Sequence, residues 1–229
     1  MRWLLSPKPA FPGNHDEYRD GRGSTHRGLA VKLCAERMTR IDLLRHGETV
    51  GGSRYRGSID DALTPQCWAA MLAALGEERD WDCIVSSPLR RCADFARDLA
   101  QRHALPLVFD ARLREIHFGA WEGKTVSDLL AAEPEAVARF WRDPVNYPPP
   151  GAEDVRALEA RVLLAWEELV MRHAGEQVLV VTHGGPLRIL LGRAQRLSLT
   201  ESLRLEVAQA QRFRMQARQE PAEAHCPSF

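Results

Sequence analysis

Hydrophobic and polar positions along the chain change their pattern at residue 38. From Met38 onward, short apolar runs alternate with segments whose apolar residues recur at helical spacing. Short apolar runs predict buried strands, and the helical spacing predicts amphipathic helices. Strands that alternate with helices are typical of an α/β fold with a mostly parallel sheet. The pattern therefore predicts a three-layer α/β/α sandwich.

The individual elements follow from the same pattern. The predicted strands are short and apolar: residues 39–44, 83–86, 105–109 and 178–181. Two helices should begin at Thr64-Pro65 and Ser87-Pro88, because a hydroxyl cap followed by proline in the first turn favours a helix start. Two more helices are expected, one with an apolar face over 155–169 and one that begins near Pro186.

The segment between the third strand and residue 155 predicts an excursion from the sheet. It contains Trp121, Phe140, Trp141, Tyr147 and three successive prolines at 148–150. Aromatic side chains in such a segment either pack as a core or lid, or stack on a flat substrate. Packing is the commoner outcome, and the sequence leaves both open.

The two ends of the chain differ from the rest. Residues 1–37 contain many helix and strand breakers and no sustained period, which predicts no secondary structure. We interpret them as a disordered extension or as a misassigned start, with Met38 as the natural first residue. The remainder divides into a domain over 38–216 and a polar tail over 217–229, which should fray from about Gln216.

Composition narrows the function classes. The 31 basic residues balance the 31 acidic ones, so no overall field favours nucleic acid or an anionic membrane, and an anion site must be local. No apolar run approaches the roughly 18 residues that span a bilayer. Five cysteines form no CxxC pair, which indicates reduced thiols and a cytoplasmic location. No spacing suggests a metal site, and no cofactor is expected.

Candidate chemistry follows the strands. In open α/β sheets, ligands bind beyond the carboxyl ends of the strands. The first strand leads into Arg45 and His46, the second into Ser87 with Arg90 and Arg91 one turn into the helix, and the fourth into His183. Imidazoles, guanidinium groups and helix N-termini at one edge predict a site for a phosphoryl group. A histidine can accept that group if its other ring nitrogen donates to a fixed acceptor.

Four segments resemble the signature blocks of the histidine phosphatase superfamily, which has the phosphoglycerate mutase-like fold. The blocks are LRHGET at 44–49, SSPLRRC at 86–92, LREIHFGAWEG at 113–123 and THGG at 182–185. The resemblance implies that His46 is the nucleophile, that Arg45, Arg91 and His183 hold the phosphoryl oxygens, and that Glu115 is the proton donor. The residues expected to contact substrate are Arg45, Ser53, Arg56, Gly57, Ser58, Arg91, Glu115, His183 and Gly184.

One departure from the family pattern concerns the phosphate contacts. Many relatives carry Asn where this chain has Gly52, so one polar contact is absent or comes from Ser53 or Ser58 instead.

Within the superfamily, GGSRYRGSIDDALT at 51–64 and PPPGAE at 148–153 resemble bacterial α-ribazole phosphatases of cobalamin biosynthesis. This implies a metal-independent phosphomonoesterase that acts on α-ribazole 5′-phosphate. The partner is then a small-molecule phosphate ester, and a homodimer is left open.

Three alternatives to this function stay open. A phosphoglycerate mutase usually has a longer insertion than the about 27 residues between Gly123 and Gly151. A broad-specificity sugar-phosphate phosphatase fits the same residues. A non-catalytic phospholigand-binding module would be expected to have lost the nucleophile or the acid, whereas all five catalytic positions are retained.

Overall fold

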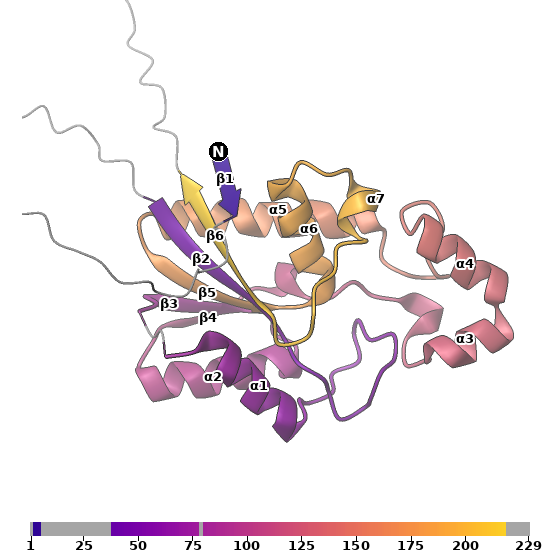
Figure 1. Cartoon of the computed structure of the whole chain (residues 1–229), viewed down its shortest axis with the longest axis horizontal. Helices are drawn as coiled ribbons and strands as arrows, with labels where there is room; N and C mark the ends of the chain where they lie inside the picture. The colour runs from indigo at the N-terminus through magenta and orange to yellow at the C-terminus, as the bar shows by residue number, and fades with distance from the viewer. Residues whose placement is uncertain (1, 6–37, 78–79, 219–229) are drawn as a thin grey trace, which may run out of the picture.

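The computed structural model describes residues 2–5, 38–77 and 80–218. Within them a six-stranded sheet lies between two layers of helices (Figure 1). The predicted α/β/α sandwich is therefore confirmed.

Four neighbouring strands of the sheet are parallel. The strand order is β1-β6-β2-β5-β3-β4. The parallel strands are β2 (Met38–Arg45), β5 (Gln177–Thr182), β3 (Cys83–Ser86) and β4 (Leu107–Phe109). Arg45 at the end of β2 pairs with Thr182 at the end of β5, and Ser86 pairs with Val181. The carboxyl ends of β2, β5 and β3 therefore meet at one edge.

Helices cover both faces because residues along each strand point alternately to opposite sides. Ile41, Leu43, Val178 and Val180 pack on one face with α5 (Val155–Arg172) and α6 (Gly184–Ala194). The opposite face packs against the other two long helices, α1 (Pro65–Leu75) and α2 (Arg90–His103). A short α7 (Leu199–Ser202) follows α6.

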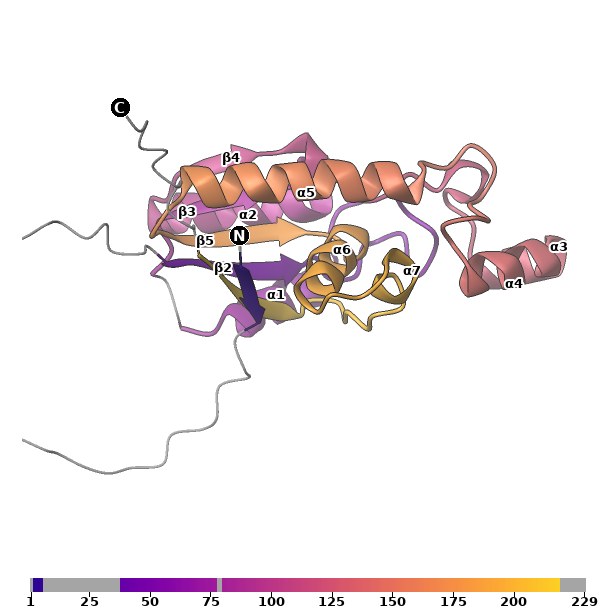
Figure 2. The same ribbon diagram turned by 90° about the horizontal axis from the view of Figure 1, so that it is seen from above.

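The predicted excursion forms a small separate unit, here called the cap. It contains α3 (Val126–Ala132) and α4 (Pro134–Arg142), which lie away from the sheet in Figures 1 and 2. Two 3₁₀ turns, Ala111–Leu113 and Gly119–Trp121, lead into it. Trp121, Leu129 and Val137 form its buried core. In Figure 2 the arrowheads of β2 and β5 point toward the side on which the cap lies.

The starts of α1 and α2 compare differently with the prediction. Thr64 accepts a hydrogen bond from the Cys67 amide at 3.2 Å and Pro65 opens α1, as predicted. The helix predicted from Ser87-Pro88 instead begins at Arg90. The Ser87 hydroxyl accepts from the Leu89 amide at 3.4 Å and also lies 2.7 Å from Nε2 of His183, so the predicted capping group makes a long-range contact as well.

Two strands were not predicted. The chain does not fray from Gln216, because β6 (Arg212–Arg218) pairs with β2 and buries Met215 and Ala217. On its other side, β6 pairs with β1 (Arg2–Leu5), although no element was expected within residues 1–37. Both strands depend on pairing with distant partners, which a local pattern does not report.

The other residues of the two predicted terminal segments, 6–37 and 219–229, lie outside the described residues, so the domain boundaries remain predictions. Among the described helices, none combines the length and the apolar character needed to cross a membrane.

Candidate active site

Two histidines lie side by side at the carboxyl edge of the parallel strands. His46 directly follows β2, and His183 follows β5 as the N-cap of α6. Their ring centroids are 5.0 Å apart with an angle of 66° between the planes. Together with Arg45 and Arg91, these residues are called the histidine centre below.

The ring of His46 is buried and neutral. Its Nδ1 lies 2.7 Å from the Gly47 carbonyl oxygen. Because a carbonyl oxygen only accepts, Nδ1 carries the proton and donates it, which leaves a lone pair on Nε2. Burial and, after it, the positive charge of Arg91 lower the pKa of His46 to about 3. The ring is therefore neutral, with a free lone pair on Nε2, throughout the physiological pH range.

His183 has the opposite tautomer. Nε of Arg91 donates to its Nδ1 at 3.2 Å, and a guanidinium group has no acceptor, so Nδ1 is unprotonated. Its Nε2 then donates to the Ser87 hydroxyl at 2.7 Å. Burial, followed by the charge of Arg91, lowers the pKa of His183 well below its usual value. Both rings are thus neutral, and their positions are set by different partners.

Arg91 is fully buried, and all three of its nitrogens have acceptors. Besides the bond to His183, Nη1 donates to the Ile59 carbonyl at 2.8 Å and Nη2 to the Gly57 carbonyl at 2.9 Å. No ion pair with a carboxylate is found for Arg91 within the described part of the chain. Its positive charge is therefore available to a bound anion.

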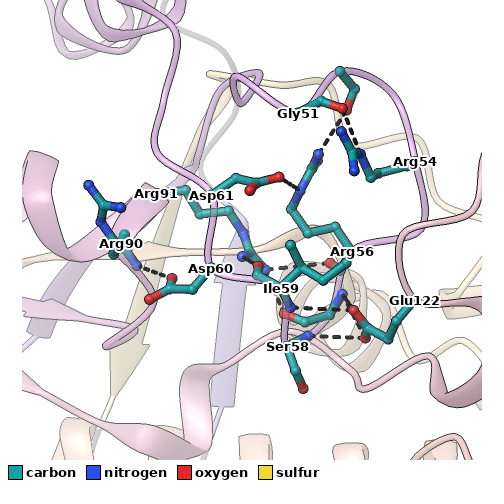
Figure 3. Close-up of polar contacts among 12 residues, drawn as sticks. Gly51, Arg54, Arg56, Ser58, Ile59, Asp60, Asp61, Arg90, Arg91 and Glu122 are labelled. Carbon is teal, nitrogen blue, oxygen red and sulfur yellow. Dashed lines mark hydrogen bonds and ion pairs between the residues drawn. The ribbon is translucent and has the colours of Figure 1, made fainter.

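The loop that supplies these carbonyls is held by one carboxylate, as Figure 3 shows. Glu122 accepts from the amides of Gly57 and Ser58, each at 3.0 Å, and from that of Ile59 at 3.3 Å. A Cβ on Gly57 would lie 2.0 Å from the Ile116 carbonyl, so the close approach requires glycine. Glu122 thus positions Arg91 through the backbone of residues 57–59.

Arg56 belongs to the same loop. Its Nε forms an ion pair with Asp61 at 2.8 Å, and its Nη2 donates to the Gly52 carbonyl at 3.0 Å (Figure 3). The charge of Arg56 is therefore largely neutralised by Asp61, and both of these contacts lie within the loop.

Arg45 and Arg188 flank the start of α6. Arg45 donates to the Val207 carbonyl through Nη1, and its buried Nε has no protein partner in the described region. A Cβ on Gly184 would lie 2.8 Å from Nη1 of Arg188 and 3.4 Å from Nε of Arg45. Glycine at this position therefore gives both guanidinium groups room. The sequence analysis missed Arg188, although its place one helical turn after Gly184 puts it on the same face.

Glu115 lies at the N-terminus of α6. Its Oε1 accepts from the amides of Gly185 and Ile116, each at 3.0 Å. The carboxyl group is half-buried and borders two hollows. It is therefore held by backbone amides while it remains within reach of a ligand in either hollow.

The first hollow, here called the aromatic hollow, has a volume of about 290 Å³. Tyr55, Phe140 and Trp141 line it together with Arg188 and Arg204. Nε1 of Trp141 donates to the Tyr55 hydroxyl at 3.1 Å, and about half of the Trp141 surface is exposed. The hollow combines flat apolar walls with two cations.

The second hollow is polar and has a volume of about 410 Å³. His117, Arg114, Glu153 and Arg161 line it, together with Ser58, whose hydroxyl lies 3.0 Å from Nδ1 of His117.

The predicted site residues thus fall into three groups. The histidine centre lies beside Gly184 and Glu115. Arg56, Gly57 and Ser58 belong to the loop that holds Arg91. Ser53 is exposed and lines neither hollow.

The four aromatic residues of the predicted excursion also lie in different surroundings. Trp121 is buried in the cap, Tyr147 is exposed, and Phe140 and Trp141 line the aromatic hollow.

Comparison with protein families gives one match, a profile of the histidine phosphatase superfamily (branch 1), over residues 41–225. The glucosyl-3-phosphoglycerate phosphatase of Mycolicibacterium vanbaalenii is 37% identical over 165 residues, which cover 67% of this chain and 73% of that protein. The metal-independent phosphoserine phosphatase of Arabidopsis thaliana is 34% identical over 175 residues, 73% of each chain. A bifunctional protein of Mycobacterium tuberculosis is 36% identical over 158 residues, which are 67% of this chain. The match spans only 43% of that longer relative.

Solved structures agree with the fold. A mycobacterial glucosyl-3-phosphoglycerate phosphatase superposes with a TM-score of 0.69 and 32% identity, over 78% of this chain and 90% of that one. The α-ribazole phosphatase from Shigella flexneri gives a TM-score of 0.67 and 27% identity, over 76% and 89%.

Proposed function

This chain belongs to the histidine phosphatase superfamily, and on that basis we propose that it hydrolyses small phosphate monoesters through a phosphohistidine formed on His46. The observation that carries the proposal is the state of that ring: neutral, with Nδ1–H bound to the Gly47 carbonyl, beside the unneutralised guanidinium group of Arg91.

In the first step, Nε2 of His46 attacks phosphorus and the bond from phosphorus to the ester oxygen breaks. Arg45 and Arg91 hold the phosphoryl oxygens, because phosphoryl transfer depends mainly on positioning and on charge stabilisation. His183 joins them by turning its Nε2–H from the Ser87 hydroxyl to a phosphoryl oxygen. Glu115, in its protonated form, gives its proton to the leaving alkoxide. The products of this step are the free alcohol and the phosphohistidine.

In the second step, water attacks the phosphohistidine. The carboxylate of Glu115 accepts the proton of the water, the bond from phosphorus to Nε2 breaks, and inorganic phosphate leaves. One carboxyl group therefore serves as acid and then as base. Neither step requires a metal ion.

For the substrate, we propose α-ribazole 5′-phosphate as the first candidate. The flat walls of Tyr55, Phe140 and Trp141 suit a benzimidazole ring. The structural similarity to the Shigella flexneri enzyme supports this choice.

A second candidate class is the phosphorylated carboxylates. Arg188 and Arg204 place two cations in the same hollow, and guanidinium groups bind carboxylates well. Two relatives, a phosphoserine phosphatase and a glucosyl-3-phosphoglycerate phosphatase, are named for esters of this class.

We further propose that the protein acts in the cytoplasm and that the predicted domain over residues 38–216 is its catalytic unit, extended in the folded chain by β1 and by the end of β6 at Arg218. Cys67, Cys83 and Cys92 are free thiols, which agrees with a reducing compartment.

The test measures phosphate release in the presence of a chelator from α-ribazole 5′-phosphate, phosphoserine, 3-phosphoglycerate, a sugar phosphate and nucleoside monophosphates. Rapid quenching should trap an acid-labile, alkali-stable phosphoenzyme. In His46→Asn we expect a loss of at least about 10⁴-fold in rate and no phosphoenzyme.

Each outcome bears on one part of the proposal. Comparable slow rates on all esters would favour a broad-specificity phosphatase. Transfer of the phosphoryl group to an acceptor without net phosphate release would indicate a mutase. Full activity in His46→Asn would refute the phosphohistidine.

A further inference from the structure

A cluster of metal-ligating side chains lies at the edge of the sheet opposite the histidine centre. Cys83 is the first residue of β3, His173 is the C-cap of α5, and Glu176 directly precedes β5. Their ligand atoms all lie within 4.8 Å of one another. We propose that Cys83, His173 and Glu176 form a binding site for one Zn²⁺ ion.

The distances fit tetrahedral coordination. Sγ of Cys83 is 3.5 Å from Nδ1 of His173, and that nitrogen is 2.7 Å from Oε2 of Glu176. With usual zinc bond lengths, sulfur and nitrogen ligands are about 3.5 Å apart, and nitrogen and oxygen ligands about 3.3 Å. The thiol and the imidazole already have this separation. The separation between the nitrogen and the carboxylate oxygen must increase by about 0.6 Å, and the Glu176 side chain, which is 44% exposed, has room to move.

The turn that carries two of the ligands is held in place by the protein. The Thr39 hydroxyl donates to the His173 carbonyl and accepts from the Gly175 amide, each at 3.1 Å. The Glu176 amide donates to the His173 carbonyl at 3.0 Å, and the Glu176 carbonyl accepts from the Arg40 amide at 3.0 Å. Such supporting contacts orient ligands before a metal arrives. Binding would therefore require little rearrangement of the backbone.

The donor set also specifies the metal. Thiolate, imidazole and carboxylate ligands together favour zinc over magnesium or calcium, which prefer oxygen. Burial, with the charges of Glu176 and Asp82, raises the pKa of the Cys83 thiol to about 12. The thiol is thus protonated without metal, and Nδ1 of His173 carries the proton that it donates to Glu176. Binding of Zn²⁺ would break the S–H bond and the N–H bond at Nδ1, and would form the S–Zn and N–Zn bonds. A neutral imidazole ring carries its remaining proton on Nε2 instead, so one proton in total is released. Three protein ligands leave the fourth position to water.

A bound ion would link the turn between α5 and β5 to the start of β3. These segments are distant in sequence, so the ion would act as a clip that stabilises the folded chain. None of the three residues belongs to the histidine centre, and the proposal is independent of the hydrolytic reaction.

The test uses the metal-free full-length chain and Co²⁺ as a spectroscopic probe. Wild type should develop a thiolate-to-cobalt charge-transfer band in the near ultraviolet, which an equimolar amount of Zn²⁺ removes. Cys83→Ser should lack this band, and Cys67→Ser is the matched control that retains it. Cys34 and Cys226 lie outside the described residues, so the difference between wild type and Cys83→Ser is the readout.

Thermal unfolding gives a second readout. Zinc at 100 times its Kd should raise the Tm of wild type by about 5–10 °C and leave that of Cys83→Ser unchanged. Phosphate release should be the same in both proteins, which separates this site from the histidine centre. Equal cobalt bands, or equal shifts in Tm, in wild type and Cys83→Ser would overturn the proposal.

Discussion

In the histidine centre, each nitrogen of Arg91 donates to a fixed acceptor, whereas the aromatic hollow on the other side of Glu115 is walled in part by side chains in contact with water. Arg91 and His183 are fully buried, while Trp141 is 50% exposed. Groups that bind the transferred phosphoryl must be precise, because small displacements are costly in catalysis. Side chains that contact the rest of the substrate do not need such precise positions. The contrast predicts that changes in the centre affect every substrate, and that changes in the hollow affect the choice among substrates.

The largest effect should come from Arg91. Arg91→Ala removes a charge that would bind the phosphoryl group and leaves the Gly57 and Ile59 carbonyls without their donor. We expect kcat/KM to fall by about 10²–10³ on every ester. Arg91→Lys should recover only a small part, because a lysine cannot reproduce the planar fork.

The neighbouring arginine is the matched control for this change. Arg90 has 58% of its side chain exposed and pairs with Asp94, so Arg90→Ala should keep kcat/KM within a few-fold of wild type. If Arg91→Ala did the same, the centre would not depend on this guanidinium group.

The next largest effect should come from Glu122, which reaches Arg91 only through the loop. In Glu122→Gln, an amide NH₂ replaces one oxygen beside several backbone donors, so part of the loop loses its acceptor. We expect about a tenfold loss in kcat/KM, weaker inhibition by inorganic phosphate, and a free energy of unfolding lower by about 1–3 kcal/mol.

Glu133→Gln is the control, since Glu133 has only a long, exposed ion pair with Lys124 at 3.7 Å. Unchanged phosphate inhibition in Glu122→Gln would show that the loop does not position Arg91.

The buried centre should also make stability depend on pH. His46 and His183 are neutral in the folded protein because their pKa values are lowered, that of His46 to about 3. In the unfolded chain the value returns to about 6.5. Between these values the unfolded state binds more protons, so the free energy of unfolding falls as the pH is lowered. From pH 7 to pH 5 His46 should contribute a loss of about 2 kcal/mol, and His183 should contribute a loss of the same sign.

Urea unfolding of wild type and His46→Asn at both pH values measures this contribution. The loss between pH 7 and pH 5 should be smaller in His46→Asn by about 2 kcal/mol. His103→Asn, which changes an exposed residue in the last turn of α2, should behave as wild type. Equal losses in all three proteins would argue against a neutral His46.

The smallest effect should come from the hollow. Trp141→Ala should lower kcat/KM for the preferred substrate by about 2- to 10-fold, the range expected for one aromatic contact. Inhibition by inorganic phosphate should not change, because phosphate occupies the centre. Tyr147→Ala alters an equally exposed aromatic residue that does not line the hollow, and it should leave both values unchanged. A uniform loss on all substrates in Trp141→Ala would remove the distinction between the two regions.

The two arginines at 90 and 91 show how far sequence reasoning extends into the site. Both follow the same strand, and only the resemblance to a family favoured Arg91. In the structure Arg91 has no exposed surface and Arg90 points outward, because residues one apart on a helix face different directions. Arg188 was missed because only the folded structure shows that it lines the aromatic hollow. The cluster of Cys83, His173 and Glu176 was also missed, since Cys83 and His173 are 90 residues apart.

The strand β6 shows the same limit in the fold. The sequence predicted a polar tail that frays from about Gln216, yet β6 continues to Arg218. Within this strand Arg214 donates to Asp42 at 2.8 Å, and Asp42 is fully buried. The charged side of this strand has a partner on β2, which no local pattern identifies.

The sequence by itself determined the four parallel strands, the main helices and the identity of the family, because periodicity, capping residues and motif blocks are local properties of the chain. The tertiary structure alone decided where α2 begins, how the terminal strands extend the sheet, which arginine faces the histidines, and how Glu122 holds the loop beneath it. These features depend on strand register and on hydrogen bonds between residues far apart in sequence, and such pairings exist only once the chain has folded.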